Sequence, residues 1–202
     1  MNNYREKINE NNAELRECID IAENLPDAPK TNFTMQDFID SRGSLNDLYR
    51  NIQIQNIEEL NWLTEVDTSK VVSCNSMFYG ALKNIETVPL FDVSNVTNAS
   101  YMFYSEGKFK IAPAFHFKQP CSANNMFNST GYHKIEECNI IMDDCTSAER
   151  MFNNCAYLTT IPQTIKTHNC TMFDYMFYKC SKLNGNYSID MSSGQYARHF
   201  LY

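Results

Sequence analysis

Eight cysteines and four histidines are the side chains of this 202-residue chain that could act as nucleophiles or metal ligands. Structural zinc uses thiolates and imidazoles in close pairs such as C-x-x-C, and no two of these cysteines have that spacing. The histidines form no H-E-x-x-H pair, and no Cys or Asp lies in a nucleophile signature. We therefore expect buried thiols that pack as small hydrophobes, with no catalytic site, cofactor or metal. The cysteines are Cys18, Cys74, Cys121, Cys138, Cys145, Cys155, Cys170 and Cys180, and the histidines are His116, His133, His168 and His199.

Three aspartates, Asp67, Asp92 and Asp190, recur at one position of a repeated pattern. Carboxylates can bind calcium or transfer protons, but Asp at the start of a turn commonly accepts a hydrogen bond from the backbone two residues further on. We interpret these three residues as turn caps. The chain has six glycines and neither a G-x-G-x-x-G nor a P-loop sequence, so no phosphate-binding loop is expected.

The acidic composition argues against a nucleic-acid partner. The formal net charge is -7 and the pI is about 5.1, whereas nucleic-acid binding depends on clustered Lys and Arg. No stretch approaches the roughly 20 apolar residues that span a bilayer, so membrane insertion is not expected. The N-terminus lacks the apolar core of a secretion signal. We expect the chain to fold in a cytoplasm, where thiols stay reduced.

A Met-Phe pair recurs along the chain at steps of 25, 24, 25 and 25 residues. A small residue stands three positions before the Met in four of the five copies, and a weaker sixth copy closes the chain at Phe200-Leu201. A unit of this length cannot bury an apolar face alone, so we expect stacked copies that share one continuous core. The predicted core residues are Met77, Phe78, Met102, Phe103, Met126, Phe127, Met151, Phe152, Met176 and Phe177.

Each unit is expected to contain one short helical turn and one short strand. The stretch "NASYMFY" spaces its apolar residues three and four apart, as a helical turn with one inward face does. The stretches "ETVPLF", "KIAPAFHF" and "LTTIP" alternate or carry β-branched residues and contain proline, which is typical of short strands. The predicted fold class is an α/β repeat solenoid, a leucine-rich-repeat-like stack of short parallel strands and helical turns over residues 64–202, with about five to six repeats.

Three phrases also resemble a known family. "LFDVSNVTNASYMFYS", "VDTSKVVSCNSMFYGALKNI" and "MFNNCAYLTTIP" are similar to the BspA-like leucine-rich-repeat surface proteins, whose repeat of about 26 residues runs D-T-S-x-V-T-x-M-x-x-M-F-x-x-C-x-x-L. The resemblance covers roughly residues 60 to 202. Ala99, Ala123 and Ala148 depart from it where the family often has Met, and the third and fourth copies lack the D-x-S-x-V phrase.

The first 30 residues read as a separate helix and linker. Seven residues of this segment fall at alternating intervals of four and three, a heptad pattern on an otherwise charged helix that Pro26 ends. Two interpretations stay open: the helix packs on its own domain or on a host protein, or it self-associates into a dimer or trimer with Asn11 as a polar layer. The residues of this attachment or oligomerisation helix are Tyr4, Ile8, Asn11, Leu15, Cys18, Ala22 and Leu25.

The segment "KINENNAELRECIDIAENLPDAP" resembles the N-terminal helix and linker of structural proteins from tailed bacteriophages. That resemblance implies a protein that assembles with other virion proteins in a host cytoplasm. Residues 31–63 are expected to form an N-terminal capping element, in which Thr34 and Asp37 begin a helix that Gly43 ends. This element would shield the first repeat near Leu60 and Trp62.

These observations favour a non-enzymatic virion structural protein of a tailed phage, a fibre, tail or capsid-surface appendage that displays the solenoid for host-surface or protein contact. The alternative is a bacterial BspA-like surface or scaffold protein that mediates adhesion or protein binding. In either case Tyr79, Tyr101, Tyr104 and Tyr178 could form an exposed contact surface for a protein or glycan, although stacking within the repeat is the commoner fate of such rings.

Overall fold

The computed structural model describes residues 34–104, 110–128, 135–184 and 188–201. The expected N-terminal helix lies outside these residues, as does His133. The predictions for that helix, which concern Tyr4, Ile8, Asn11, Leu15, Cys18, Ala22 and Leu25, therefore remain predictions.

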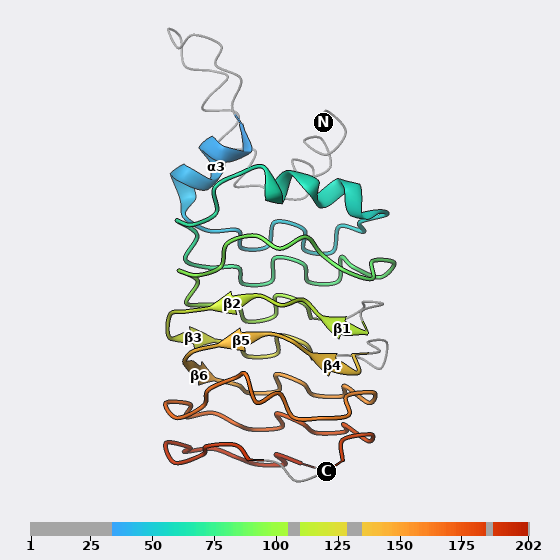
Figure 1. Ribbon diagram of the computed structural model, residues 1–202, viewed down its shortest axis with the longest axis vertical. Helices are drawn as coiled ribbons and strands as arrows, with labels where there is room; N and C mark the ends of the chain where they lie inside the picture. The colour runs from blue at the N-terminus through green and yellow to red at the C-terminus, as the bar shows by residue number, and fades with distance from the viewer. Residues whose placement is uncertain (1–33, 105–109, 129–134, 185–187, 202) are drawn as a thin grey trace, which may run out of the picture.

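The described chain begins with helix α3, Met35–Arg42, at one end of the molecule (Figure 1). The capping box expected from the sequence is present: the Thr34 side chain accepts a hydrogen bond from the Asp37 N–H, and the Asp37 carboxylate accepts one from the Thr34 N–H at 2.8 Å. Gly43 ends the helix in the left-handed conformation, with φ 61°. Its N–H donates to the Ile39 carbonyl, so the cap satisfies one of the last carbonyls of the helix.

A 3-10 helix, η1, spans Ile57–Thr64 and lies over the first repeat units (Figure 1). Its apolar residues Leu60 and Leu63 are buried, and the Trp62 indole N–H donates to the Tyr49 hydroxyl at 2.6 Å. Together α3 and η1 cover the apolar side chains that the first unit would otherwise expose.

The repeat pattern begins one unit earlier than the sequence suggested. Leu48 and Tyr49 occupy the places of Met and Phe, and the Tyr49 ring stacks on Phe78 with centroids 5.7 Å apart. The Tyr49 N–H donates to the Met77 carbonyl at 2.8 Å, as a repeat residue does toward the next unit. Part of the segment assigned to a cap therefore belongs to the repeat.

The Met-Phe segments are consecutive turns, and the expected helical turns are absent from the described repeat units. The residue before each Met has a positive φ, which interrupts helical geometry. Alternate N–H groups then point along the stack: Tyr101 donates to the Asn124 carbonyl at 2.9 Å, and Phe103 to the Met126 carbonyl at 3.0 Å. These left-handed residues are Ser76, Tyr101, Asn125, Arg150 and Tyr175, with His199 before Phe200.

Short parallel strands join neighbouring units on the other sides of the stack. The described residues contain three such pairs (Figure 1): β1 Ile111–Ala112 with β4 Glu137–Cys138, β2 His116–Phe117 with β5 Ile141–Met142, and β3 Cys121–Ser122 with β6 Cys145–Ser147. The expected strand in "KIAPAFHF" thus contains β1 and β2. Residues 86–91 and 158–162 form no strand. Pro89 and Pro162 have no N–H to donate to a ladder, and in the second segment Thr159 bonds to the neighbouring units by single backbone hydrogen bonds.

The core is a set of side-chain ladders that run through the stacked units. The phenylalanines stack ring on ring, with centroids 5.4 to 5.7 Å apart from Phe78 to Phe177. None of the ten predicted Met and Phe side chains is more than 1% exposed. Thiols are stacked in the same way, since Cys121 of β3 and Cys145 of β6 are register partners of each other. Among the residues described here, seven cysteines are free and six of them are buried.

Candidate binding surface

Two rows of side chains define one edge of the stack, which we call the tyrosine edge. One row comes from the left-handed residue before each Met, and the other from the residue after each Phe. Met and Phe point into the core, and most of their neighbours lie at the surface, although Ser76 and Asn125 are buried. The edge holds two clusters: an upper cluster of Arg50, Tyr79, Tyr101 and Tyr104, and a lower cluster of Arg150, Tyr175, Tyr178, Lys179 and His199.

The upper cluster is a short stack of one cation and three rings. The Tyr79 and Tyr104 rings are parallel to within 7°, with centroids 4.6 Å apart, and the Arg50 guanidinium lies 4.8 Å from the Tyr79 centroid. Tyr101 is 5.6 Å from Tyr104 and is 36% exposed. Partial burial, followed by the neighbouring Tyr79 and Tyr101, raises the pKa of Tyr104, so its hydroxyl remains a hydrogen-bond donor at neutral pH.

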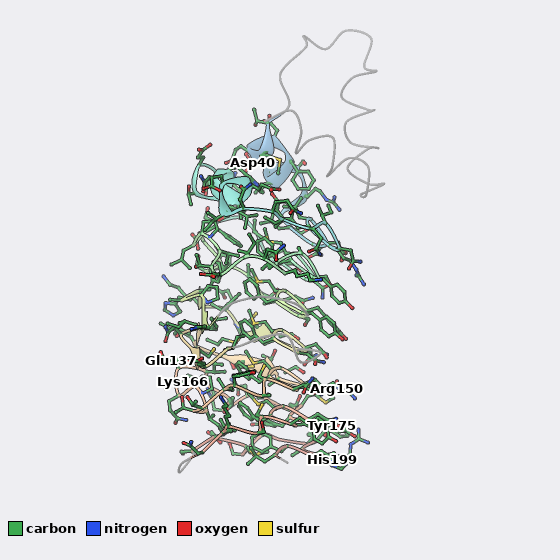
Figure 2. All side chains as sticks on the ribbon, turned by 90° about the vertical axis from the view of Figure 1, so that its right-hand side faces the viewer. Asp40, Glu137, Arg150, Lys166, Tyr175 and His199 are labelled. Carbon is green, nitrogen blue, oxygen red and sulfur yellow. The ribbon has the colours of Figure 1, made fainter. Side chains whose placement is uncertain are left out.

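The lower cluster repeats this arrangement with different residues. The Arg150 guanidinium lies 4.9 Å from the Tyr175 centroid, and the His199 ring stacks on Tyr175 at 5.0 Å. Tyr178 meets Tyr175 edge to face at 5.5 Å, and Lys179 lies over Tyr178. Figure 2 shows Arg150, Tyr175 and His199 in one column along a single side of the molecule.

The two clusters stand three repeats apart. Tyr175 and Tyr178 occupy the same repeat positions as Tyr101 and Tyr104, with 74 residues between equivalent positions. The positions between them carry polar side chains: Asn128 and Asn153 are half-buried, and Asn125 is buried. The edge therefore presents aromatic, polar and aromatic sections in sequence.

Each arginine of the edge, and Arg198 beside it, forms an ion pair with an acidic side chain. Arg50 contacts Asp47 at 2.9 Å, and Arg150 contacts Glu149. Arg198 binds Asp174 through two guanidinium nitrogens, at 2.6 and 2.9 Å. These hydrogen bonds lower the pKa of Asp174 and hold its carboxylate ionised. The paired charges keep the guanidinium groups ordered rather than adding a strong local field.

Sequence reasoning identified only part of this surface. Of the four tyrosines it proposed, Tyr79, Tyr101 and Tyr104 lie together, whereas Tyr178 belongs to the other cluster. It missed the arginines, Tyr175 and His199. The signal was available in the repeat: a large residue on either side of Met-Phe does not fit into the core that Met and Phe fill.

The histidines that could have carried chemistry lie apart. His116 contacts the Asp143 carboxylate at 3.0 Å with both side chains well exposed, and His168 lines a shallow hollow with Asp190. Within the described ranges, no group of three His, Cys, Asp or Glu side chains could hold a metal ion.

The recurring aspartates act as turn caps, as the sequence predicted. The carboxylates of Asp67, Asp92 and Asp190 each accept a hydrogen bond from the backbone N–H two residues on, at 2.8 to 2.9 Å. The hydrogen bonds from Ser69 and Ser192 lower the pKa of Asp67 and of Asp190. Their role is to shape the turn that precedes the three repeats in which they occur.

Comparison with known proteins finds one family. The family model described as "Mycoplasma protein of unknown function, DUF285" matches residues 44–140 and 134–195. No curated protein and no solved structure gives a significant match. The matched residues include the early unit at Leu48-Tyr49 and most of the stack. Separately, none of the helices in the described segments has the length and apolarity needed to cross a membrane.

Proposed function

Because this chain belongs to the family described as Mycoplasma proteins of unknown function, DUF285, we propose that it is a BspA-like repeat protein with a non-enzymatic binding role. In this proposal the stacked units form a leucine-rich-repeat-like solenoid. The solenoid presents the tyrosine edge to a protein partner, as a surface or scaffold protein would. The family match and the repeat geometry support the proposal together.

The observation that carries this proposal is the composition and order of the tyrosine edge. Tyr and Arg are the residue types most enriched, with Trp, at the energetic centres of protein interfaces. In the upper cluster Arg50, Tyr79 and Tyr104 are already stacked, so binding would cost little side-chain entropy. The hydroxyls of the same tyrosines supply hydrogen bonds at the rim of the apolar rings.

Site-specific cross-linking tests the proposed surface. A photoreactive benzoylphenylalanine at Tyr101 should cross-link a partner when the full chain is exposed to cells of its source. The matched control is the same group at Val72, which is 50% exposed and belongs to neither cluster. Cross-links of equal yield at both positions would contradict the proposal. Cross-linking to glycan rather than protein at Tyr101 would also contradict the choice of partner.

A role in a phage virion is a second proposal, and it rests on residues 4–25 and their resemblance to phage structural proteins. We propose that this segment joins the repeats to other virion proteins or to copies of the same chain. Deletion of residues 1–28 should leave the repeats folded but lower the assembly mass measured by light scattering. An unchanged mass and unchanged incorporation into particles would contradict this role.

A further inference from the structure

One junction between neighbouring repeat units differs from those that follow it. From β1 onward, backbone hydrogen bonds join the units on the face of the stack that carries β1 and β4. Thr159 donates to the Glu136 carbonyl at 3.2 Å, and Asn184 to the Thr159 carbonyl at 3.2 Å. Residues 85–91 and 110–117 are all described, yet no backbone hydrogen bond joins these two segments. We call this junction the open seam.

Proline explains part of the missing pairing. Pro89 and Pro113 occupy equivalent positions of the two units, 24 residues apart. Neither has a backbone N–H, so neither can donate across the seam. Among the described residues, β1 is therefore paired on one side only, through Ile111 with Glu137 and Ala112 with Cys138.

The seam is open only at the surface. Behind it, Phe91 and Phe115 contact each other edge to face with centroids 4.9 Å apart. On the far side, the Phe78 N–H donates to the Met102 carbonyl at 3.0 Å, so the two units remain joined there. A local opening at the seam does not require the stack to separate.

A hollow of about 530 Å³ lies at the seam. Glu86 and Thr87 line one wall, and residues 110–114 line the other together with Asn139. The volume falls within the range of about 300 to 1,000 Å³ that ligand clefts occupy. Ile111 within the lining is 51% exposed, and Leu90, which follows Pro89 in the chain, is 54% exposed. The hollow thus combines one unpaired strand edge with apolar side chains.

We infer that the open seam binds one extended polypeptide segment of a partner, which adds to the unpaired edge of β1. Strand addition takes its affinity from main-chain hydrogen bonds and its specificity from alternate side chains. The small exposed side chain of Ala114 leaves room for a β-branched residue on the segment, and Ile111 offers an apolar contact. Glu86 and Lys110 carry opposite charges on facing walls, so a segment with one basic and one acidic residue fits them.

This site is separate from the tyrosine edge. Figure 2 places Glu137, the register partner of Ile111, on the side opposite Tyr175 and His199. The two surfaces can therefore be tested independently, and a negative result for the open seam would not contradict the proposal for the tyrosine edge.

The test uses the full chain labelled with ¹⁵N and a capped peptide, acetyl-Lys-Val-Thr-Val-Thr-Glu-amide. We expect chemical-shift changes and slower amide exchange confined to residues 86–90 and 110–114. Ala114→Trp, which fills the hollow from an exposed position, should weaken binding at least about tenfold. Ser193→Trp places the same ring at an exposed position outside the seam and should bind as the parent chain does.

In the Ala114→Trp protein, a rate of amide hydrogen exchange at Phe103 equal to that of the parent chain would verify that the stack is intact. Ile111→Lys is a second variant, which should also weaken peptide binding. No response up to about 1 mM peptide, a limit of about -4 kcal/mol, would overturn the inference. Equal binding by the Ala114→Trp protein would also overturn it, as would shifts confined to the tyrosine edge.

Discussion

The ring of Phe127 lies parallel to that of Phe152, with centroids 5.5 Å apart and 11° between their planes. The same relation recurs one repeat on, where Phe152 and Phe177 are 5.4 Å apart. The Phe127 N–H also donates to the Met151 carbonyl at 2.8 Å. Side-chain stacking and the backbone ladder thus fix the same register between units, so that a shift of one residue would break both.

Gly80 tests the turn geometry of the repeat. It has φ +66°, and a Cβ added there would lie 2.8 Å from the Asn51 side-chain oxygen. Gly80→Ala should lower the free energy of unfolding by about 1 to 2 kcal/mol, because an L-residue in the left-handed region costs that much. Urea denaturation measures the change. A variant as stable as the parent chain would show that the turn relaxes freely.

The reverse substitution, to glycine, can be tested at Lys179, which occupies the same repeat position as Gly80 and has φ 61°. Its side chain is exposed and lies over the Tyr178 ring. Lys179→Gly removes the left-handed strain and loses one exposed cation–π contact of about 0.5 kcal/mol. We expect a net gain in stability of up to about 1 kcal/mol, and Lys179→Val should lose stability. Thermal unfolding measures the stability of both variants. A Lys179→Val protein more stable than the Lys179→Gly protein would contradict the strain argument.

Asp174 should make stability depend on pH in the acid range. Its side chain is 2% exposed, and hydrogen bonds from Arg198 lower the pKa of its carboxyl. A group with a lowered folded-state pKa stabilises the protein above its unfolded pKa, about 3.9, and loses that contribution as pH falls through the folded value. Stability should therefore decline below about pH 4.

Asp174→Asn measures this contribution directly. We expect a loss of about 1 to 3 kcal/mol at pH 7, since a buried charged hydrogen bond is removed, and a smaller difference from the parent chain near pH 2. Asp143→Asn is the control, because Asp143 is half-exposed and pairs with His116 at the surface. A constant difference between parent and Asp174→Asn across this range would contradict the assigned pKa direction.

The described thiols should react slowly in the folded protein. Burial raises the pKa of Cys121, Cys138 and Cys180 to about 12 each. A hydrogen bond with Cys145 lowers the pKa of Cys170, but that side chain is also fully buried. Alkylation of Cys121 by iodoacetamide at pH 8 should be at least about a hundredfold slower than in urea. Mass spectrometry of the peptide that contains each thiol measures the rate of alkylation in the folded protein. Rapid alkylation would contradict the prediction and would place the thiol at the surface.

The repeat itself was predictable from the sequence because one interval governs many residues. The positions of Phe103 and Phe127 indicate a shared core without any knowledge of the fold, and Asp67 and Asp92 indicate turns by their residue type and spacing. These features are local or strictly periodic. They follow from burial and turn chemistry, which sequence patterns record well.

Other features depended on geometry that the pattern does not encode. The spacing in "NASYMFY" suits a helix, but Tyr101 is left-handed and its N–H bonds to the next unit instead of its own. Leu48-Tyr49 escaped detection because it replaces both Met and Phe while keeping their volume and apolar character. The open seam depends on two prolines in register, which becomes visible only when the units are stacked.

The stability of Phe127→Ala tests most directly the central claim that like side chains stack into one continuous core. Phe127 is fully buried between Phe103 and Phe152. We predict a loss of about 3 to 5 kcal/mol in the free energy of unfolding, from lost burial and the cavity left behind. Tyr196→Ala, at a ring that is 49% exposed, should change it by less than about 0.5 kcal/mol. A loss below about 1 kcal/mol at Phe127 would contradict the stacked core.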